Sequence, residues 1–196
     1  MANKIRYGIS NVYYAVATID AATNVATYAT PVAIPGAVSL SMDAQGDTTP
    51  FYADNIKYYI SNSNNGYEGD LEVAYLPKAF EKDVLGMSED GKTVLFENAN
   101  ASPVHFALLF QFEGDAKATK HVLYNCVASR AGINANTKED TVTPQTETIS
   151  ITATAIHNAT LNLDVVKAKA DETTDATTYG GWTSAVYTGT AVTPGP

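Results

Sequence analysis

Apolar and polar residues alternate along much of this chain, and the alternation predicts β-strands. From Phe106 to Phe112 every second residue is Phe or Leu. These side chains share one face of a strand predicted over Val104 to Glu113, since successive strand residues point to opposite faces. A second strand is predicted from Thr119 to Arg130, after a Gly114-Asp115 turn. The two strands form the predicted central hairpin of the core.

Shorter runs predict further strands on both sides of this hairpin. Within a strand predicted over Gln145 to Ile156, Ile and Ala residues face inward while Thr and Ser residues face outward, which is typical of a half-buried strand. The other predicted strands cover residues 5–9, 12–16, 37–42, 57–61, 92–97 and 161–169. The fold class is therefore predicted to be mainly β.

The segment from Tyr67 to Tyr75 places three carboxylates in a row. Glu68, Asp70 and Glu72 fall on one strand face, opposite the apolar positions. Carboxylates spaced about 7 Å apart along a strand repel one another, so this face should meet water or a polar cavity. Two interpretations stay open, an ordinary solvated strand face and a surface whose negative charge has a function.

One helix is predicted, over residues 77–85, and it flanks the β-structure. Pro77 is tolerated in the first helical turn, and Phe80 and Val84 lie one turn apart on the same face. Gly86 supplies the stop signal at the C-terminal end.

Two segments lack a sustained hydrophobic period. Residues 43–55 contain Gly, Pro and three aspartates, and we predict a long loop or a protruding hairpin, of the kind that usually has a function in a compact domain. Residues 171–196 are rich in Thr, Asp, Gly and Ala, and we predict an arm and flexible tail that follow a single domain over residues 1–170. Trp182, Val186 and Tyr187 interrupt this arm and could dock on the fold or on a neighbour.

The charge balance argues against a protein that grips nucleic acid or an anionic membrane. The 196 residues carry a formal net charge of −9, whereas such proteins gain affinity by placing Lys and Arg against phosphates. A negative sign suits a protein that lets nucleic acid pass without adsorbing it, and it equally serves solubility alone. The 45% of apolar residues suffices for the core of one domain.

The residues suggest no catalytic or metal-binding constellation. His105, His121 and His157 are widely separated and lack zinc-ligand spacing. The single cysteine, Cys126, lies in an alternating run and is interpreted as a small apolar strand residue. No nucleophile elbow, phosphate-binding loop or dinucleotide fingerprint is present in the sequence. We therefore expect a non-enzymatic protein that holds neither a cofactor nor a metal.

The start of the chain superficially resembles a secretory signal. Lys4 and Arg6 precede a partly apolar stretch, but Ser10, Asn11 and Asp20 interrupt it, and its alternation suits strands better. No apolar run approaches the roughly 20 residues that cross a bilayer. We expect a soluble, unprocessed protein.

A resemblance to a known family extends over nearly the whole chain, to about Tyr187. Residues 35–77, PGAVSLSMDAQGDTTPFYADNIKYYISNSNNGYEGDLEVAYLP, closely resemble the major tail (tail tube) protein family of siphophages infecting Gram-positive bacteria. The resemblance continues in IRYGISNVYYA, FALLFQFEGD, HVLYNCVASR, TKEDTVTPQTETISITATA and the late Trp182 with AVY. The combination is specific, although each piece alone would be weak.

The resemblance implies a fold, an assembly and partners. The implied fold is a β-sandwich or half-barrel with one flanking helix and long loops. Six copies are implied to close a ring, and rings to stack into a tail tube through which DNA passes during ejection. The implied partners are further copies of the chain and the tape-measure, tail initiator and tail terminator proteins, with no membrane. The implied location is the virion tail, reached from the host cytoplasm during assembly.

The resemblance also gives roles to the segments singled out above. Glu68, Asp70 and Glu72 become the candidate lumen-facing acidic row. The candidate ring-stacking loop comprises Asp43, Asp47, Phe51, Tyr52, Asp54 and Asn55, and the candidate inter-subunit arm comprises Trp182, Val186 and Tyr187.

Two alternative functions remain open at this point. The first is a ring protein of a secretion-system tube, which would share the architecture. The second is a monomeric β-sandwich that binds carbohydrate or protein, which the twelve tyrosines allow, because Tyr combines a large contact area with a polar tip. A binding module would form no higher assembly.

Overall fold

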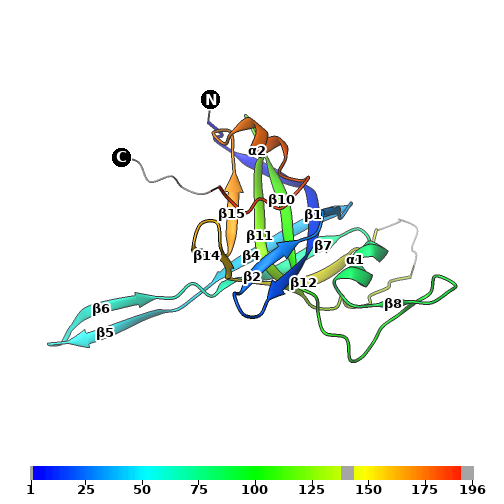
Figure 1. Cartoon of the computed structure of the whole chain (residues 1–196), viewed down its shortest axis with the longest axis horizontal. Helices are drawn as coiled ribbons and strands as arrows, with labels where there is room; N and C mark the ends of the chain where they lie inside the picture. Colours follow the sequence, from blue (N-terminus) through cyan, green and yellow to red (C-terminus); the bar gives the residue numbers. More distant parts are fainter. Residues whose placement is uncertain (1, 138–143, 191–196) are drawn as a thin grey trace.

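The computed structural model describes residues 2–137 and 144–190, and it confirms a mainly β fold. Fifteen strands and two short helices lie in these described ranges (Figure 1). The strands are β1 (Arg6–Asp20), β2 (Val25–Tyr28), β3 (Val32–Ala33), β4 (Ala37–Gln45), β5 (Thr48–Ala53), β6 (Ile56–Asn62), β7 (Gly66–Val73), β8 (Ser88–Glu89), β9 (Leu95–Phe96), β10 (Phe106–Gly114), β11 (Thr119–Ala128), β12 (Glu147–Thr154), β13 (Ile156–Asn158), β14 (Leu163–Val165) and β15 (Lys167–Ala170). The helices are α1 (Lys78–Asp83) and α2 (Ala176–Gly180).

One large sheet contains most of the strands. Its order is β14-β13-β2-β1-β10-β11-β12-β7-β4, with β15 also paired to β11 and β3 to β1. All pairings are antiparallel except the single pair between β13 and β2. The sheet curls so that β4, at one end of the order, also contacts β1. The result is a half-open barrel with an inner and an outer face.

The main hydrophobic cluster fills the inside of this half-barrel. It combines side chains from β1, β7, β10, β11 and β12 with side chains from α1, including Leu71, Phe106 and Ile149, all fully buried. Phe80 of α1 packs edge-on against Tyr14, with ring centroids 5.0 Å apart, and against Phe106 at 5.6 Å. Helix α1 therefore plugs the interior, as the predicted spacing of Phe80 and Val84 requires.

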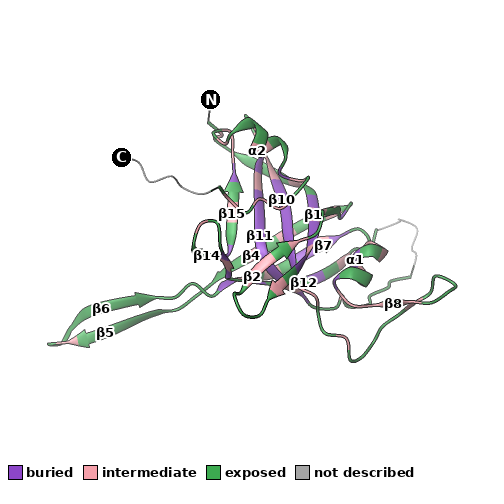
Figure 2. Ribbon diagram, in the orientation of Figure 1, coloured by how far each residue is buried: buried purple, intermediate pink, exposed green. Residues whose placement is uncertain are grey.

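A second hydrophobic cluster covers the outer face of the central strands. It contains Leu109, Val122, Ile156 and Trp182 from β10, β11, β13 and the C-terminal segment. Because both faces of β10 are covered, its residues from Phe106 to Gln111 are all buried (Figure 2). The sequence predicts only one apolar face for this strand. Ala107 and Leu109 fill the second face.

The predicted strands and the predicted helix are present, but several of them begin or end at other residues than predicted. The two strands predicted over residues 5–16 form one strand, β1, whose register shifts twice around Gly8 and Asn11, both at positive φ. The strand predicted over 161–169 is divided into β14 and β15. Helix α1 agrees with the predicted helix and is followed by Gly86 at φ 71°. Helix α2 was not predicted, since its sequence, ATTYG, has no apolar stripe.

Phe80→Ala tests the plug in the half-barrel. We expect the free energy of unfolding to fall by about 3–5 kcal/mol, because the change leaves a cavity between Tyr14 and Phe106. Chemical denaturation measures this loss. The control is Phe96→Ala, where a side chain 56% exposed is removed and a change within about 0.5 kcal/mol is expected. Equal effects from the two variants would contradict the packing.

His121 is a buried, neutral histidine at the rim of the main cluster. Its ring stacks on Phe110 with centroids 5.2 Å apart, and its Nε2 atom has no hydrogen-bond partner among the described residues. Burial, together with the charges of Lys167, Arg6 and Lys169, lowers the pKa of His121 from 6.5 to about 4. The folded chain therefore resists protonation of this ring.

This lowered pKa predicts a loss of stability in acid. Between pH 6.5 and about 4 the unfolded chain binds a proton at His121 that the folded chain does not bind, so the free energy of unfolding falls as the pH falls. Denaturation at several pH values in this range should show a weaker dependence of the free energy of unfolding on pH for His121→Phe, which keeps an aromatic ring but has no titrating group. A wild-type slope in His121→Phe would refute the assignment.

Candidate functional site

The predicted acidic row lies on the outer face of the half-barrel wall formed by β12, β7 and β4. Leu71 and Val73 of β7 are fully buried in the main cluster, so the alternation turns Glu68, Asp70 and Glu72 outward. Gly69 permits close contact with β4, because a Cβ atom there would lie 1.8 Å from the Ser41 carbonyl oxygen. The packing of the interior thus fixes which way the carboxylates point.

The neighbouring strands supply mainly hydroxyls to the same face. Ser39, Ser41 and Asp43 of β4 lie opposite Glu72, Asp70 and Glu68, and Thr148, Ser150 and Thr152 of β12 lie opposite them on the other side. We call the four carboxylates and these five hydroxyl residues the acidic face. Asp43, which the sequence assigned to the loop, joins the row through the β4–β7 register.

Hydroxyl groups hold two of the carboxylates in place. The Thr146 Oγ1 donates to Glu72 Oε1 at 2.6 Å, and the Ser39 Oγ donates to Glu72 Oε2 at 2.9 Å. These two hydrogen bonds lower the pKa of the Glu72 carboxyl, and the bond from Thr146 has the larger effect. The Ser150 Oγ donates to Asp70 Oδ1 at 2.6 Å. Within the described residues no carboxylate of the acidic face forms a salt bridge, so its negative charge is not neutralised by side chains there.

Of the loop and the protruding hairpin predicted for residues 43–55, the structure has the hairpin, in which these residues form the end of β4, β5 and the turn into β6. Strand β4 leads into β5, and β6 leads into β7, so a long ribbon leaves the barrel wall (Figure 1). It turns at Asp54 and Asn55, both at positive φ (51° and 62°), as a two-residue hairpin turn requires. From here on, the arm means β5, β6 and their turn, and residues 171–190 are called the C-terminal segment. The sequence predicted β6, as a strand over residues 57–61, but not β5, because the arm has no buried face to impose alternation.

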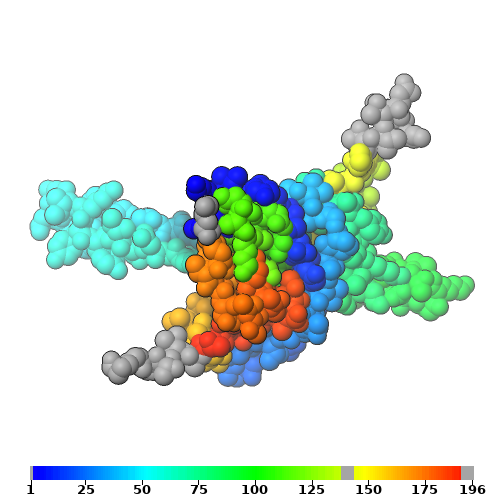
Figure 3. Space-filling view, turned by 90° about the horizontal axis from the view of Figure 1, so that it is seen from above, coloured from blue at the N-terminus to red at the C-terminus, as the bar shows by residue number. Residues whose placement is uncertain are grey.

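The arm is exposed along its whole length. Every residue of β6 and nearly every residue of β5 is exposed (Figure 2). In the space-filling view the arm projects on the side of the body opposite the segment around β8 and β9 (Figure 3). Its exposed large apolar side chains are Phe51, Tyr52, Ile56, Tyr58, Tyr59 and Ile60. Asp47, another predicted loop residue, lies at the base of the arm, where its carbonyl accepts from the Ser63 N–H.

The C-terminal segment docks on its own subunit. Trp182 is 3% exposed, and its Nε1 donates to the His121 carbonyl at 3.3 Å. Tyr187 stacks on Trp182 with centroids 5.6 Å apart. The Trp182 side chain thus packs against its own subunit, on an apolar face of β11 that the sequence pattern did not reveal. Val186 and Tyr187 remain partly exposed, and a contact with another subunit stays a prediction for them.

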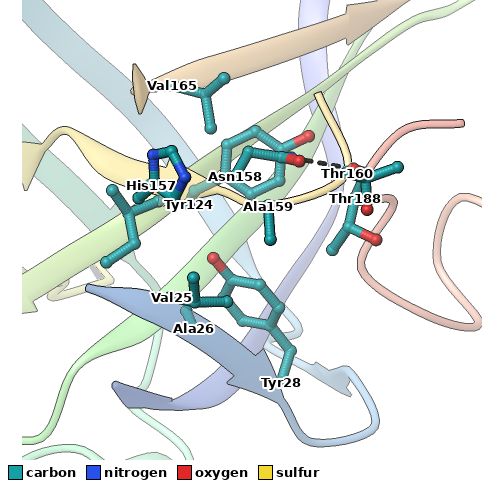
Figure 4. A pocket seen from close by; sticks show the side chains of 11 residues that line it. Val25, Ala26, Tyr28, Tyr124, His157, Asn158, Ala159, Thr160, Val165 and Thr188 are labelled. Carbon is teal, nitrogen blue, oxygen red and sulfur yellow. Dashed lines mark hydrogen bonds between the residues drawn. The ribbon is translucent and has the colours of Figure 1, made fainter. Parts of the chain in front are cut away.

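A small hollow of about 120 Å³ lies beside this docking site, between β2 and β13. Figure 4 shows the hydrogen bond from Asn158 Nδ2 to the Thr188 carbonyl, 2.8 Å long. The Tyr124 hydroxyl donates to the Tyr187 carbonyl at 2.6 Å. These polar groups therefore fasten the C-terminal segment to the sheet.

The remaining features concern metals and membranes. No cluster of three or more His, Cys, Asp or Glu side chains suited to a metal ion occurs among the residues that the structure describes. In the same ranges neither helix is long and apolar enough to span a membrane.

The two main surface features of this mainly β protein are thus the acidic face and the exposed apolar arm. The sequence profile of the family described as phage tail tube protein matches residues 2–182. The chain therefore belongs to the phage tail tube protein family, the major tail proteins of phages of Gram-positive bacteria. A comparison with curated proteins gives no match. Family membership identifies the chain as a structural virion protein of the phage tail.

The hydroxyl bonds to Glu72 can be tested directly. We expect the pKa of Glu72 to rise toward its ordinary value in a Thr146→Val, Ser39→Ala variant, because the hydrogen bonds that favour the carboxylate are lost. NMR titration of the Glu72 side-chain carboxyl measures this rise. Ser41→Ala, which leaves both bonds intact, is the control. An unchanged pKa in the double variant would contradict the arrangement.

Proposed function

We propose that the chain forms the wall of the tail tube, with its acidic face lining the bore through which DNA travels. The observation that supports this most is the acidic face itself, a broad sheet surface of carboxylates and hydroxyls with no salt bridge to its carboxylates among the described residues. Phosphates are repelled by unneutralised carboxylates, and a wall without Lys or Arg releases no counterions to favour adsorption. DNA would pass along such a wall without sticking.

The free edge of β4 supports closure into a ring. Among the described residues β4 has one sheet partner, β7, so its other edge is unpaired. A nine-residue edge strand exposes N–H and C=O groups that invite pairing with another chain. In a closed ring of identical subunits each such edge meets its neighbour. We propose rings of six copies, as in the implied tail-tube architecture.

The arm supports stacking of the rings. It leaves the same sheet that carries the acidic face, so it would extend from one ring toward the next. The tape-measure protein inside the tube and the initiator and terminator proteins at its ends are the further proposed partners. Assembly would take place in the host cytoplasm before DNA is transmitted.

Electron microscopy tests the proposal. Purified subunits should form six-membered rings or hollow tubes in negative stain at high concentration or when the tail initiator proteins are added, with matching high-mass species in sizing chromatography. A chain that stays monomeric under both conditions would overturn the tube proposal and favour a monomeric binding module.

The role of the acidic face predicts a change in DNA adsorption. Tubes of the variant Glu68→Gln, Asp70→Asn, Glu72→Gln should still form but should retain several times more fluorescent DNA in a pelleting assay, because the repulsion of phosphates is reduced. The matched control, Asp115→Asn, Asp164→Asn, Glu172→Gln, changes the net charge equally on other surfaces and should behave as wild type. Equal retention by the two variants would contradict a lumenal acidic face.

A further inference from the structure

Both faces of the arm carry large apolar side chains. Pro50 pairs with Ile60 and Phe51 pairs with Tyr59, and adjacent pairs on a two-stranded ribbon point to opposite sides. The register shifts by one residue after the Phe51–Tyr59 pair, so Tyr58 has no cross-strand partner, and Tyr52 then pairs with Lys57 and Ala53 with Ile56. The Tyr52 face therefore comprises Pro50, Tyr52, Lys57 and Ile60, and the Phe51 face comprises Phe51, Ala53, Ile56 and Tyr59.

The exposure on the two faces is nearly equal. Tyr52 and Ile60 are 57% and 51% exposed, and Phe51 and Tyr59 are 60% and 63% exposed. A ribbon that lies flat on a partner has one apolar face and one polar face in contact with water. An isolated two-stranded ribbon is also barely stable in water. The arm therefore has two faces that need a cover.

The charge of the arm indicates what covers it. Residues 48–62 contain one acidic and one basic side chain, Asp54 and Lys57, so the arm is neutral within a chain of formal charge −9. Copies of an acidic chain repel one another, and they approach most easily through a neutral, apolar segment. This composition fits other copies of the same chain.

We propose that in the assembled tube the arm is inserted between two other copies, one covering the Tyr52 face and the other covering the Phe51 face. This inference rests on the proposed function, because the two covering surfaces are those of copies in the tube. A head-to-tail contact of this kind brings an arm from one ring to the junction between two subunits of the next. Each arm then ties three subunits together, and the ribbon becomes stable only on assembly.

Thiol labelling tests the insertion without disrupting the interface. Cys126 is fully buried and burial raises its pKa to about 12, so the wild-type chain gives little background. Tyr52→Cys and Tyr59→Cys place one thiol on each face, and each variant is assembled as a minor component with wild-type subunits. Ala22→Cys, in the exposed turn after β1, is the control for a thiol outside the arm.

Both arm thiols should react with maleimide at least roughly tenfold more slowly in tubes than in free subunits, because a thiol enclosed at an interface is inaccessible. If either one keeps its free-subunit rate in tubes, the arm lies flat on one partner and the insertion is refuted, while the tube proposal stands. If wild-type subunits form no tube, the proposed function fails and the insertion fails with it.

Discussion

Two strands, β4 and β7, belong both to the wall of the half-barrel and to the ribbon that becomes the arm, and this continuity constrains the rest of the molecule. Leu71 and Val73 are locked into the interior, and a slip of one residue would turn the apolar side chains out and the carboxylates in. The interior packing therefore sets the direction of the acidic face. Because the same strands run on into β5 and β6, it also sets the direction in which the arm leaves the body.

This arrangement explains how a tail tube protein can work through geometry. In the proposed tube the bore requires an inert, negative surface, and β7 with its neighbours offers a candidate for it in carboxylates that accept hydrogen bonds from hydroxyls such as that of Thr146. The assembly needs contacts among like-charged copies, and the neutral arm and the free edge of β4 supply candidates for them. Stability is left to the two hydrophobic clusters on either side of β10.

Short-range periodicity was enough to predict the strand-rich fold, the helix with Phe80 and the outward direction of Glu68, Asp70 and Glu72. It failed where the side-chain environment depends on distant parts of the chain. Docking of Trp182 on the fold or on a neighbour was left open, because nothing local reveals that β11 carries a second apolar face. Periodicity left a loop and a protruding hairpin open for residues 43–55, because β5 has no buried side to impose alternation. Asp43 could be added to the acidic face only through its register with Glu68.

A cryo-electron-microscopy reconstruction of the assembled tube would show on which surface the acidic face lies. We expect Glu68, Asp70 and Glu72 to line the bore, with the β4 edge of each subunit beside its neighbour. A reconstruction that places these carboxylates on the outer surface of the tube, or within a contact between rings, would contradict it.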